Sequence, residues 1–455
     1  MILPSGTSVA TVKMTILGGG GFRVPLVYEA VVAARERVAV DEVVLHDDDA
    51  ARLEVMRQVL AQLGGTPRVT ATTELTVAVA GADVIFSAIR VGGTAGRTRD
   101  EREALAEGLL GQETVGPGGL AYAMRTVPVV DRIAETIAEH APQAWTISFT
   151  NPASIVTEAM RDHLGERVVG ICDTPISLVR RALRAVGRDA RAFDTGAVEI
   201  DYAGLNHLGW LRGLRAAGGG EDLLPGLLAD DAALAGLEEA RLMGPDWLRT
   251  IGALPNEYLY YYDFTREAVA GIAASERTRG EFLLAQQASF YERAAAEPER
   301  ALELWRAALA EREATYMATE RESQDAGERA EEDLGGGYHE VAVDLMAALL
   351  GGEEHRMILD VGNAAPDGSP IVAGLPADAV VEVPVRADGA GVRPLAGTSP
   401  LEPVMLARVQ AVKACERLVI EAARSRSEET AWKAFAFHPL VDSAAVARRL
   451  VERYL

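Results

Sequence analysis

The chain of 455 residues has only two cysteines, Cys172 and Cys415. Two cysteines cannot build a disulfide framework, which favours a reducing compartment. No apolar run approaches the roughly 20 residues that a membrane-spanning helix needs. Residues 1–13 lack the basic start and apolar core of a signal peptide. We therefore expect a cytoplasmic protein with no membrane partner.

Basic residues are also in the minority, because 45 lysines and arginines face 67 aspartates and glutamates, for a net charge of −22. Nucleic acids and anionic membrane surfaces select basic patches, so neither is an expected partner. An anionic small molecule would instead need a local group of arginines that overcomes the acidic background. The 49% hydrophobic and 25% charged content is typical of a globular protein.

Short β-branched segments alternate with helical patterns along the first part of the chain. Strands are expected at residues 11–17, 41–45, 68–71, 83–89, 144–149 and 168–171. Helices are expected at 24–34, 51–63, 126–139 and 155–164, with a glycine- and arginine-rich loop after Arg90. This alternation predicts an α/β fold, a Rossmann-like doubly wound parallel sheet, in a domain of residues 11–195.

The pattern changes in the second part of the chain. Strands are expected at 197–205, 356–361 and 380–385, and long helices at 280–295, 298–320 and 407–425. The acidic, glycine-rich stretch 325–337 is expected to be an exposed loop or the start of a helix. We predict a C-terminal mixed α+β substrate domain of residues 196–455.

The glycine cluster Gly18–Gly21 lies between the first strand and the first helix. Such a turn lets backbone amides approach a pyrophosphate at a helix N-terminus. Asp47 ends the next strand, where an acid binds the ribose hydroxyls and favours NAD over its 2′-phosphorylated relative. Arg23 stands at the third glycine position of the usual motif. NAD binding is favoured, and a glycine-rich turn without a ligand is the alternative.

Several chemically active side chains follow predicted strands. Cys172 and Asp173 end the strand at 168–171, and His207 follows the strand at 197–205. Each alone is more typical of a structural group, but together Cys172 and His207 suggest a half-filled metal site with positions open for substrate. A cysteine and a histidine ligand do not by themselves indicate whether the bound metal is manganese or zinc. Arg90 also ends a strand and suits an anionic ligand, as Arg97 and Arg125 nearby do, whereas Arg99 is expected on the surface.

Four tyrosines, Tyr258, Tyr260, Tyr261 and Tyr262, lie close together in the sequence. Core packing explains most such clusters. One buried phenol beside a cation can nevertheless act as a base.

These pieces occur together in the segments ILGGGGFRVP, VVLHDDD, FSAIRVGG, GQETVGPGG, FTNPASIV, GICDTP, GLNHLGW, LPNEYLYYY, ERTRGE and GLPADAVVEVP, between residues 14 and 386. In this order they resemble family 4 of the glycoside hydrolases, the NAD- and divalent-metal-dependent 6-phosphoglycosidases. The family departs from the usual two-carboxylate mechanism of glycoside hydrolysis.

The resemblance implies a mechanism that begins with oxidation at carbon 3 of the sugar by NAD. A divalent metal, Mn²⁺, held by Cys172 and His207, would polarise the resulting ketone. Tyr258 would remove the acidified proton at carbon 2, and the aglycone would leave by elimination. Water would then add, and the hydride would return to carbon 3.

The resemblance also implies binding roles for further residues. Arg90, Asn151 and Arg279 would contact the substrate, including its anionic group at carbon 6, and Glu113 would lie near the metal and substrate. The cofactor would contact Gly18, Gly19, Gly20, Gly21, Phe22, Asp47 and Arg90. A homodimer or homotetramer is expected.

Two departures from the family pattern bear on the substrate. Asp173 follows the metal cysteine, as in the α-glucoside members, where it serves as the acid for the leaving group and contacts substrate. The flanking sequence is more similar to the β-glucoside members. Phe22-Arg23 replaces a small polar residue, so a 6-sulfo-sugar, as in the related sulfoquinovosidases, is an alternative to a 6-phospho-sugar.

The resemblance therefore implies hydrolysis of 6-phosphoglucosides, with the β-anomer favoured and the α-anomer as the alternative. A lactate/malate-type NAD-dependent dehydrogenase shares the expected fold, but we find no catalytic histidine followed by Gly-Asp. A non-catalytic NAD-sensing regulator is the third possibility.

Overall fold

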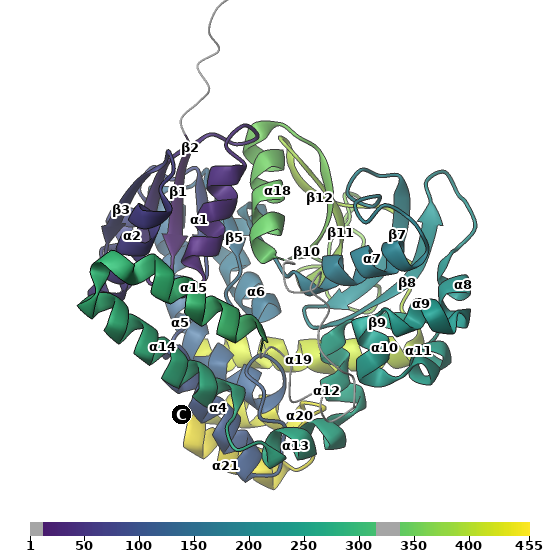
Figure 1. The fold of residues 1–455 in the computed structure, drawn as a ribbon. Helices are drawn as coiled ribbons and strands as arrows, with labels where there is room; N and C mark the ends of the chain where they lie inside the picture. The colour runs from purple at the N-terminus through teal and green to yellow at the C-terminus, as the bar shows by residue number, and fades with distance from the viewer. Residues whose placement is uncertain (1–11, 315–336) are drawn as a thin grey trace, which may run out of the picture.

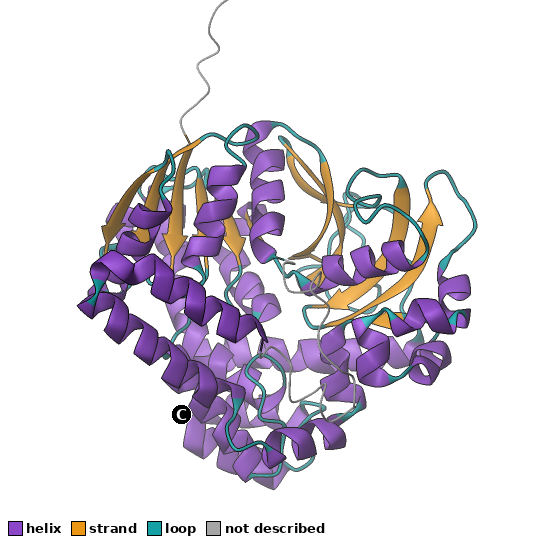
Figure 2. Ribbon diagram, in the orientation of Figure 1, coloured by secondary structure: helices purple, strands orange, loops and turns teal. Residues whose placement is uncertain are grey.

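In the computed structural model, which describes residues 12–314 and 337–455, one large mixed sheet runs through both halves of the chain (Figures 1 and 2). Within the described residues, the strand order of this sheet is β3-β2-β1-β4-β5-β6-β10-β11-β7-β8-β9, with β12 paired to β11. Helices cover the sheet in Figure 2.

The N-terminal strands are parallel and match the predicted ones. They are β1 (Val12–Leu17), β2 (Val40–His46), β3 (Arg68–Thr72), β4 (Val84–Ser87), β5 (Trp145–Ser148) and β6 (Val168–Gly170). The chain order reverses between β1 and β4, so their carboxyl ends border a crevice of the kind that binds ligands. Helices α1 (Val24–Ala33), α2 (Ala50–Leu63) and α6 (Ala153–Leu164) also lie where predicted.

The predicted loop after Arg90 is wrong, because this stretch contains the helix α4 (Gly93–Ala106). The helix predicted at 126–139 is observed as α5 (Gly116–His140), which begins ten residues earlier than predicted. The glycines at the start of α5 serve close packing. A Cβ atom at Gly118 would lie 2.2 Å from the carbonyl oxygen of Gln112. The short α3 (Leu75–Val79) precedes β4, and α7 (Thr174–Ala185) follows β6.

The second half extends the same sheet with antiparallel strands. β10 (His355–Gly362) joins β6, with Asp360 opposite Gly170, and pairs along its length with β11 (Val380–Asp388). The remaining strands are β7 (Val198–Leu205), β8 (Leu208–Ala216), β9 (Leu254–Pro255) and β12 (Gly391–Pro394). β8, β9 and β12 were not predicted. The division into two domains at residue 195 stays a prediction.

Helices of the second half lie against the first half. In Figure 1, α14 (Arg279–Ala296) and α15 (Ala301–Ala314) cross in front of α2 and α5. Helix α14 also packs against α4, and α19 (Pro403–Ser425) packs against α5. The predicted helix 298–320 is observed as α15, and its remainder, with residues 325–336, lies outside the described residues. The other helices are α8 (Leu224–Ala229), α9 (Asp231–Ala235), α10 (Glu238–Met243), α11 (Pro245–Ile251), α12 (Tyr260–Asp263), α13 (Thr265–Ala274), α18 (Tyr338–Gly351), α20 (Glu428–Phe437) and α21 (Ala444–Tyr454).

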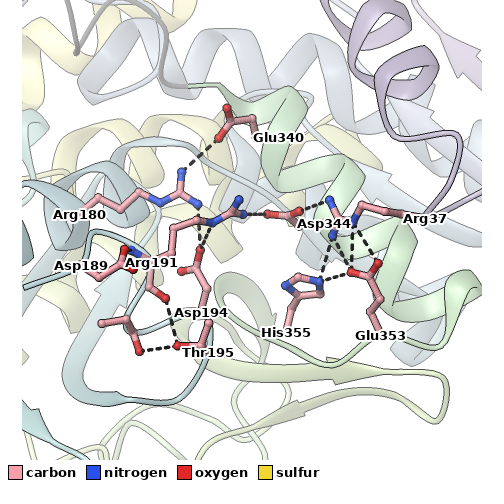
Figure 3. A network of polar contacts seen from close by, with 11 residues as sticks. Arg37, Arg180, Asp189, Arg191, Asp194, Thr195, Glu340, Asp344, Glu353 and His355 are labelled. Atoms are coloured by element: carbon pink, nitrogen blue, oxygen red, sulfur yellow. Dashed lines mark hydrogen bonds and ion pairs between the residues drawn. The ribbon is translucent and has the colours of Figure 1, made fainter.

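A network of ion pairs ties α18 to both halves (Figure 3). The Asp344 carboxylate on α18 accepts from Arg37 at 2.8 Å and from Arg191 at 2.7 Å. Arg37 also pairs with Glu353, which contacts His355 at 2.6 Å. These contacts fix the helix whose first residue, Tyr338, lies in the cavity described below. Among the described helices, none has the length and apolar character needed to cross a membrane.

Candidate active site

A cavity of about 1580 Å³ opens at the carboxyl ends of the parallel strands. This volume exceeds that of a typical single-ligand pocket and has room for a dinucleotide and a sugar together. The predicted site residues that line it are Gly18, Gly21, Phe22, Asp47, Arg90, Glu113, Asn151, Cys172, Asp173, His207, Tyr258 and Arg279. Gly19 and Gly20 complete the glycine loop between them.

The glycine loop packs closely on the neighbouring strand ends. The amides of Gly18 and Gly19 donate to the carbonyl oxygen of His46 at 2.9 and 2.7 Å. Gly18 has φ +82°, and a Cβ atom there would lie 2.6 Å from the carbonyl oxygen of Ala88. A loop this tight lets the backbone approach a ligand at the start of α1.

Asp47 lies half-buried at the end of β2, and its Oδ2 accepts a hydrogen bond from the Gly20 amide at 2.9 Å. Burial raises the pKa of this carboxyl. The acid is therefore held at the position where a Rossmann-type site contacts the ribose of a dinucleotide. The arrangement fits NAD.

Cys172 and His207 come together although they are distant in the sequence. The Cys172 Sγ and His207 Nε2 atoms are 3.7 Å apart, and both side chains are buried. Metal–sulfur bonds of about 2.3 Å and metal–nitrogen bonds of about 2.1 Å span this separation at a near-tetrahedral angle. The pair therefore fits a single divalent cation.

Burial sets the protonation of both groups. It lowers the pKa of His207 to about 3, so the imidazole is neutral and able to ligate a metal. Burial also raises the pKa of the Cys172 thiol. A bound cation opposes that effect, because metal binding requires the thiolate and releases its proton.

Within residues 12–314 and 337–455, no group of three or more histidine, cysteine, aspartate or glutamate side chains is placed to hold a metal. An ion at Cys172 and His207 would thus have two protein ligands in the described part of the chain. Its remaining positions would go to water or substrate, as in catalytic metal sites.

Glu382 on β11, which the sequence reasoning missed, holds the turn that carries His207. Its carboxylate accepts from Tyr202 Oη at 2.6 Å and from Asn206 Nδ2 at 3.1 Å. His207 itself has φ +62° between β7 and β8. Burial raises the pKa of Glu382 to about 7. The available sequence signal was an acid inside the apolar run VVEVP.

Tyr258 lies flat against His207. Their ring centroids are 3.6 Å apart and the planes differ by 2°. The preceding Asn256 donates from Nδ2 to Thr174 Oγ1 at 2.9 Å, and that oxygen lies 3.2 Å from Cys172 Sγ. Tyr260 and Tyr261 are buried in the core, as the packing interpretation of the cluster predicts.

Arg90 and Arg97 share the carboxylate of Glu113. Arg90 forms an ion pair with it, and Arg97 Nη1 lies 2.6 Å from its Oε1. Burial opposes ionisation, but the two arginines prevail and lower the pKa of Glu113 to about 2. Arg99 is exposed, in agreement with the prediction, and Arg125 pairs with Asp100 instead of lining the cavity.

Two further arginines, Arg23 and Arg312, line the cavity. The sequence connected Arg23, through Phe22-Arg23, to the choice of anionic substrate but did not assign Arg312 to the site. Arg23 at the third glycine position was the available signal for the first. Arg312 gives no local signal, because it lies in a charged helical stretch. Tyr338 joins them, with its ring 4.0 Å from that of Phe149.

Two family models match the chain. Residues 13–187 match the family 4 glycosyl hydrolase model, and residues 202–441 match the family 4 glycosyl hydrolase C-terminal domain. The chain therefore belongs to family 4 of the glycosyl hydrolases. It is a hydrolase, and the resemblance identified from the motifs is confirmed.

Similar proteins agree with this assignment. A probable 6-phospho-beta-glucosidase of Bacillus subtilis (strain 168) is 27% identical over 464 residues, covering 97% of this chain and 95% of its own. A maltose-6′-phosphate glucosidase of the same bacterium is 27% identical over 459 residues, with 97% and 94% covered.

A solved structure of the 6-phospho-beta glucosidase from Thermotoga maritima, with manganese, NAD⁺ and glucose-6-phosphate, has a TM-score of 0.79. It is 26% identical and covers 98% of this chain and 97% of its own. The predicted Rossmann-like α/β fold with a C-terminal domain is thereby confirmed.

Proposed function

We propose that this chain hydrolyses 6-phosphoglucosides with the help of NAD and a divalent cation, Mn²⁺. The observation that carries the proposal is the cluster of Cys172, His207 and Tyr258 in the same cavity as the glycine loop and Asp47. The relatives that act on 6-phosphorylated glucosides, and the related structure with NAD⁺, manganese and glucose-6-phosphate, support it.

NAD and the divalent cation would supply chemistry that the side chains lack. NAD held by the glycine loop and Asp47 would supply a reversible hydride acceptor for carbon 3 of the sugar. Cys172 and His207 would hold the cation, which would supply a Lewis acid for the oxygen on carbon 3 and so increase the acidity of the proton at carbon 2. Water completes the overall hydrolysis.

The chain's own side chains bind the sugar and move protons. Tyr258, which lies on His207, accepts the proton from carbon 2. Asp173 lines the cavity directly after Cys172 and protonates the departing oxygen. Arg90, Asn151 and Arg279 also line it and contact the substrate, while Glu113 holds Arg90 in place through their ion pair.

For the anomer we propose a β preference, with the 6-phospho-α-glucosides as the alternative. The relatives include a 6-phospho-beta-glucosidase and a maltose-6′-phosphate glucosidase at equal identity. The sequence flanking His207 favours the β type, and Asp173 favours the α type. A homodimer or homotetramer in the cytoplasm stays part of the proposal.

The test is a hydrolysis assay with 4-nitrophenyl 6-phospho-β-glucoside, its α-anomer and a sulfoquinovoside. Each substrate is assayed with and without NAD, Mn²⁺ and a reductant. We expect turnover of the β-phosphoglucoside that needs NAD and Mn²⁺. Turnover of none of the substrates under the complete conditions would overturn the proposal.

Two rival functions predict other results. A lactate/malate-type dehydrogenase would accumulate NADH with a 2-hydroxy acid and release no nitrophenol. A non-catalytic NAD sensor would show neither reaction.

A further inference from the structure

Two aromatic side chains from the second half of the chain hold the backbone of the glycine loop. Tyr291 on α14 donates from Oη to the carbonyl oxygen of Gly20 at 2.6 Å. Trp305 on α15 donates from Nε1 to the carbonyl oxygen of Phe22, the residue that follows the loop, at 2.8 Å. Neither side chain lines the cavity, so both reach the loop from outside the ligand site. We call Tyr291 and Trp305 the aromatic donor pair.

Packing supports both hydrogen bonds. Phe22 is buried, and its ring lies edge-on to that of Phe290 at 5.4 Å and 6.3 Å from that of Trp305. The Arg52 guanidinium lies 4.2 Å from the ring centre of Tyr291. Burial raises the pKa of Tyr291 to about 12, so the phenol keeps its proton at neutral pH and acts as a donor. Helices α14 and α15 pack on each other and on α2, so one packed unit carries both donors (Figure 1).

Tyr291 fixes the turn of the glycine loop. In a trans peptide the N–H points opposite to the C=O. The carbonyl of Gly20 accepts from Tyr291, so the amide of Gly21 on the same peptide points toward the inside of the turn. There it donates to the carbonyl oxygen of Gly18 at 2.8 Å. The hydrogen bond from Tyr291 therefore stabilises the peptide orientation that closes the turn.

Trp305 fixes the peptide at the start of α1. Because the carbonyl of Phe22 accepts from Trp305, the amide of Arg23 on the same peptide points away from α15. Arg23 is the N-cap residue of α1, and its side chain does not cap the helix. The start of α1 is therefore oriented to receive an anionic group such as the pyrophosphate of NAD.

We propose that Tyr291 and Trp305 are positioning residues for the cofactor, which hold the glycine loop in the conformation that binds the pyrophosphate of NAD. The inference rests on the proposed function in taking NAD as the ligand of the loop. It gives α14 and α15 a part in cofactor affinity that the strand, glycine loop and helix of the N-terminal half do not contain. Without either hydrogen bond, NAD has to order the loop as it binds, and this weakens its affinity.

The test uses two variants that remove a donor and keep a ring, Tyr291→Phe and Trp305→Phe. The chain offers a matched control for each, an aromatic side chain that donates to a backbone carbonyl outside the cavity. Tyr454 Oη and Trp432 Nε1 each do so at 2.7 Å. Tyr454→Phe and Trp432→Phe therefore remove the same kind of hydrogen bond away from the cofactor loop.

Three measurements separate affinity, stability and turnover. Calorimetry gives the Kd of NAD and of ADP-ribose, which keeps the pyrophosphate but lacks the nicotinamide. Thermal unfolding without ligand gives the stability of each variant, and circular dichroism checks its fold. Hydrolysis of 4-nitrophenyl 6-phospho-β-glucoside at varied NAD gives the NAD concentration for half-maximal rate.

We expect Tyr291→Phe and Trp305→Phe each to weaken NAD binding about three- to tenfold, the range expected for one lost hydrogen bond. ADP-ribose should lose the same factor, because it shares the pyrophosphate. Each control variant should lose as much thermal stability as its partner variant but bind NAD within about twofold of wild type. In the hydrolysis assay, the loss should appear in the NAD concentration for half-maximal rate more than in kcat.

Other outcomes overturn the inference. An NAD affinity within about twofold of wild type in both donor variants would do so, and so would wild type that binds neither NAD nor ADP-ribose. An equal loss of NAD affinity in the controls would assign the effect to general destabilisation. A loss for NAD with unchanged ADP-ribose binding would place the defect at the nicotinamide. If wild type hydrolyses no substrate but binds NAD in a Tyr291-dependent way, the proposed function fails while the positioning role stands.

Discussion

Replacing Tyr258 with phenylalanine removes a single oxygen atom and keeps the ring that lies on His207. Because the two rings are parallel at 3.6 Å, phenylalanine preserves the stacking. Stacking of this type contributes about 0.5–1.5 kcal/mol. The Mn²⁺ affinity of Tyr258→Phe should therefore stay within about twofold of wild type, since 1.4 kcal/mol corresponds to a factor of ten.

The catalytic effect should be far larger. A positioned general base contributes about 10²- to 10⁴-fold to the rate, so kcat should fall by about that factor in Tyr258→Phe. Tyr258→Ala should lose the same factor and in addition bind Mn²⁺ about two- to tenfold more weakly, because the ring is gone.

The assay measures kcat on 4-nitrophenyl 6-phospho-β-glucoside at saturating NAD, and Mn²⁺ affinity by electron paramagnetic resonance. Tyr262→Phe is the matched control, because Tyr262 belongs to the same segment but does not line the main cavity. It should keep wild-type kcat. A kcat for Tyr258→Phe within fivefold of wild type would refute the role of the phenol as the base.

The remaining predictions concern the affinity for Mn²⁺, the stability contributed by a buried ion pair and the pH dependence of stability. Cys172→Ala removes one of the two proposed metal ligands and should weaken Mn²⁺ binding at least about 100-fold by titration, a larger loss than changes in residues that only orient a ligand cause. An unchanged affinity would contradict the proposed site. Lys413→Met removes the buried ammonium group that pairs with Glu158 at 2.9 Å and with Glu416 at 2.5 Å. Glu158 keeps its ion pair with Arg417, but the buried Glu416 keeps only the hydrogen bond from Ser154, so the change should cost about 3–5 kcal/mol in urea unfolding. A loss below about 1 kcal/mol would contradict this. The hydrogen bonds from Arg37 lower the pKa of Glu353 to about 2, so its stabilisation is complete above pH 4.5 and is lost as the pH falls toward 2. Because Glu353 is partly exposed, Glu353→Gln should remove only about 1 kcal/mol of this acid-dependent stability, and an unchanged pH slope would count against the pairing.

The parallel half of the fold was predictable from sequence because most of its strands are short apolar segments followed by a polar residue or glycine, although β3 (RVTAT) has no buried residue. Helix α4 was not readable, since its buried face carries Asp100 and Glu101 in place of an apolar stripe. Asp100 pairs with Arg125 of α5, which the tertiary structure brings near, and Glu101 pairs with Arg97 one turn earlier in α4. The sequence of α4 therefore lacks the apolar periodicity from which a helix would have been predicted.

The site was predictable where it depends on strand ends and not where it depends on long-range pairing. Arg90 and Cys172 follow strands directly, so their place at the sheet edge could be inferred. The approach of His207 to Cys172 requires β10 and β11, from much later in the chain, to connect β6 with β7. The residue types suggested the pair as a possible metal site, and the motif resemblance implied that the two side chains hold one metal. Arg312 lies outside the motifs, whereas Glu382 lies in the motif GLPADAVVEVP but gained its role beside Asn206 only from the three-dimensional arrangement.

The central claim is that hydrolysis proceeds by breaking and remaking carbon–hydrogen bonds of the sugar. Hydrolysis of the 6-phosphoglucoside in D₂O, with nuclear magnetic resonance of the glucose 6-phosphate product, tests it most directly. The account predicts deuterium at carbon 2, with the original hydrogen retained at carbon 3. A product that keeps its original hydrogen at carbon 2 would show direct displacement of the aglycone and contradict the account.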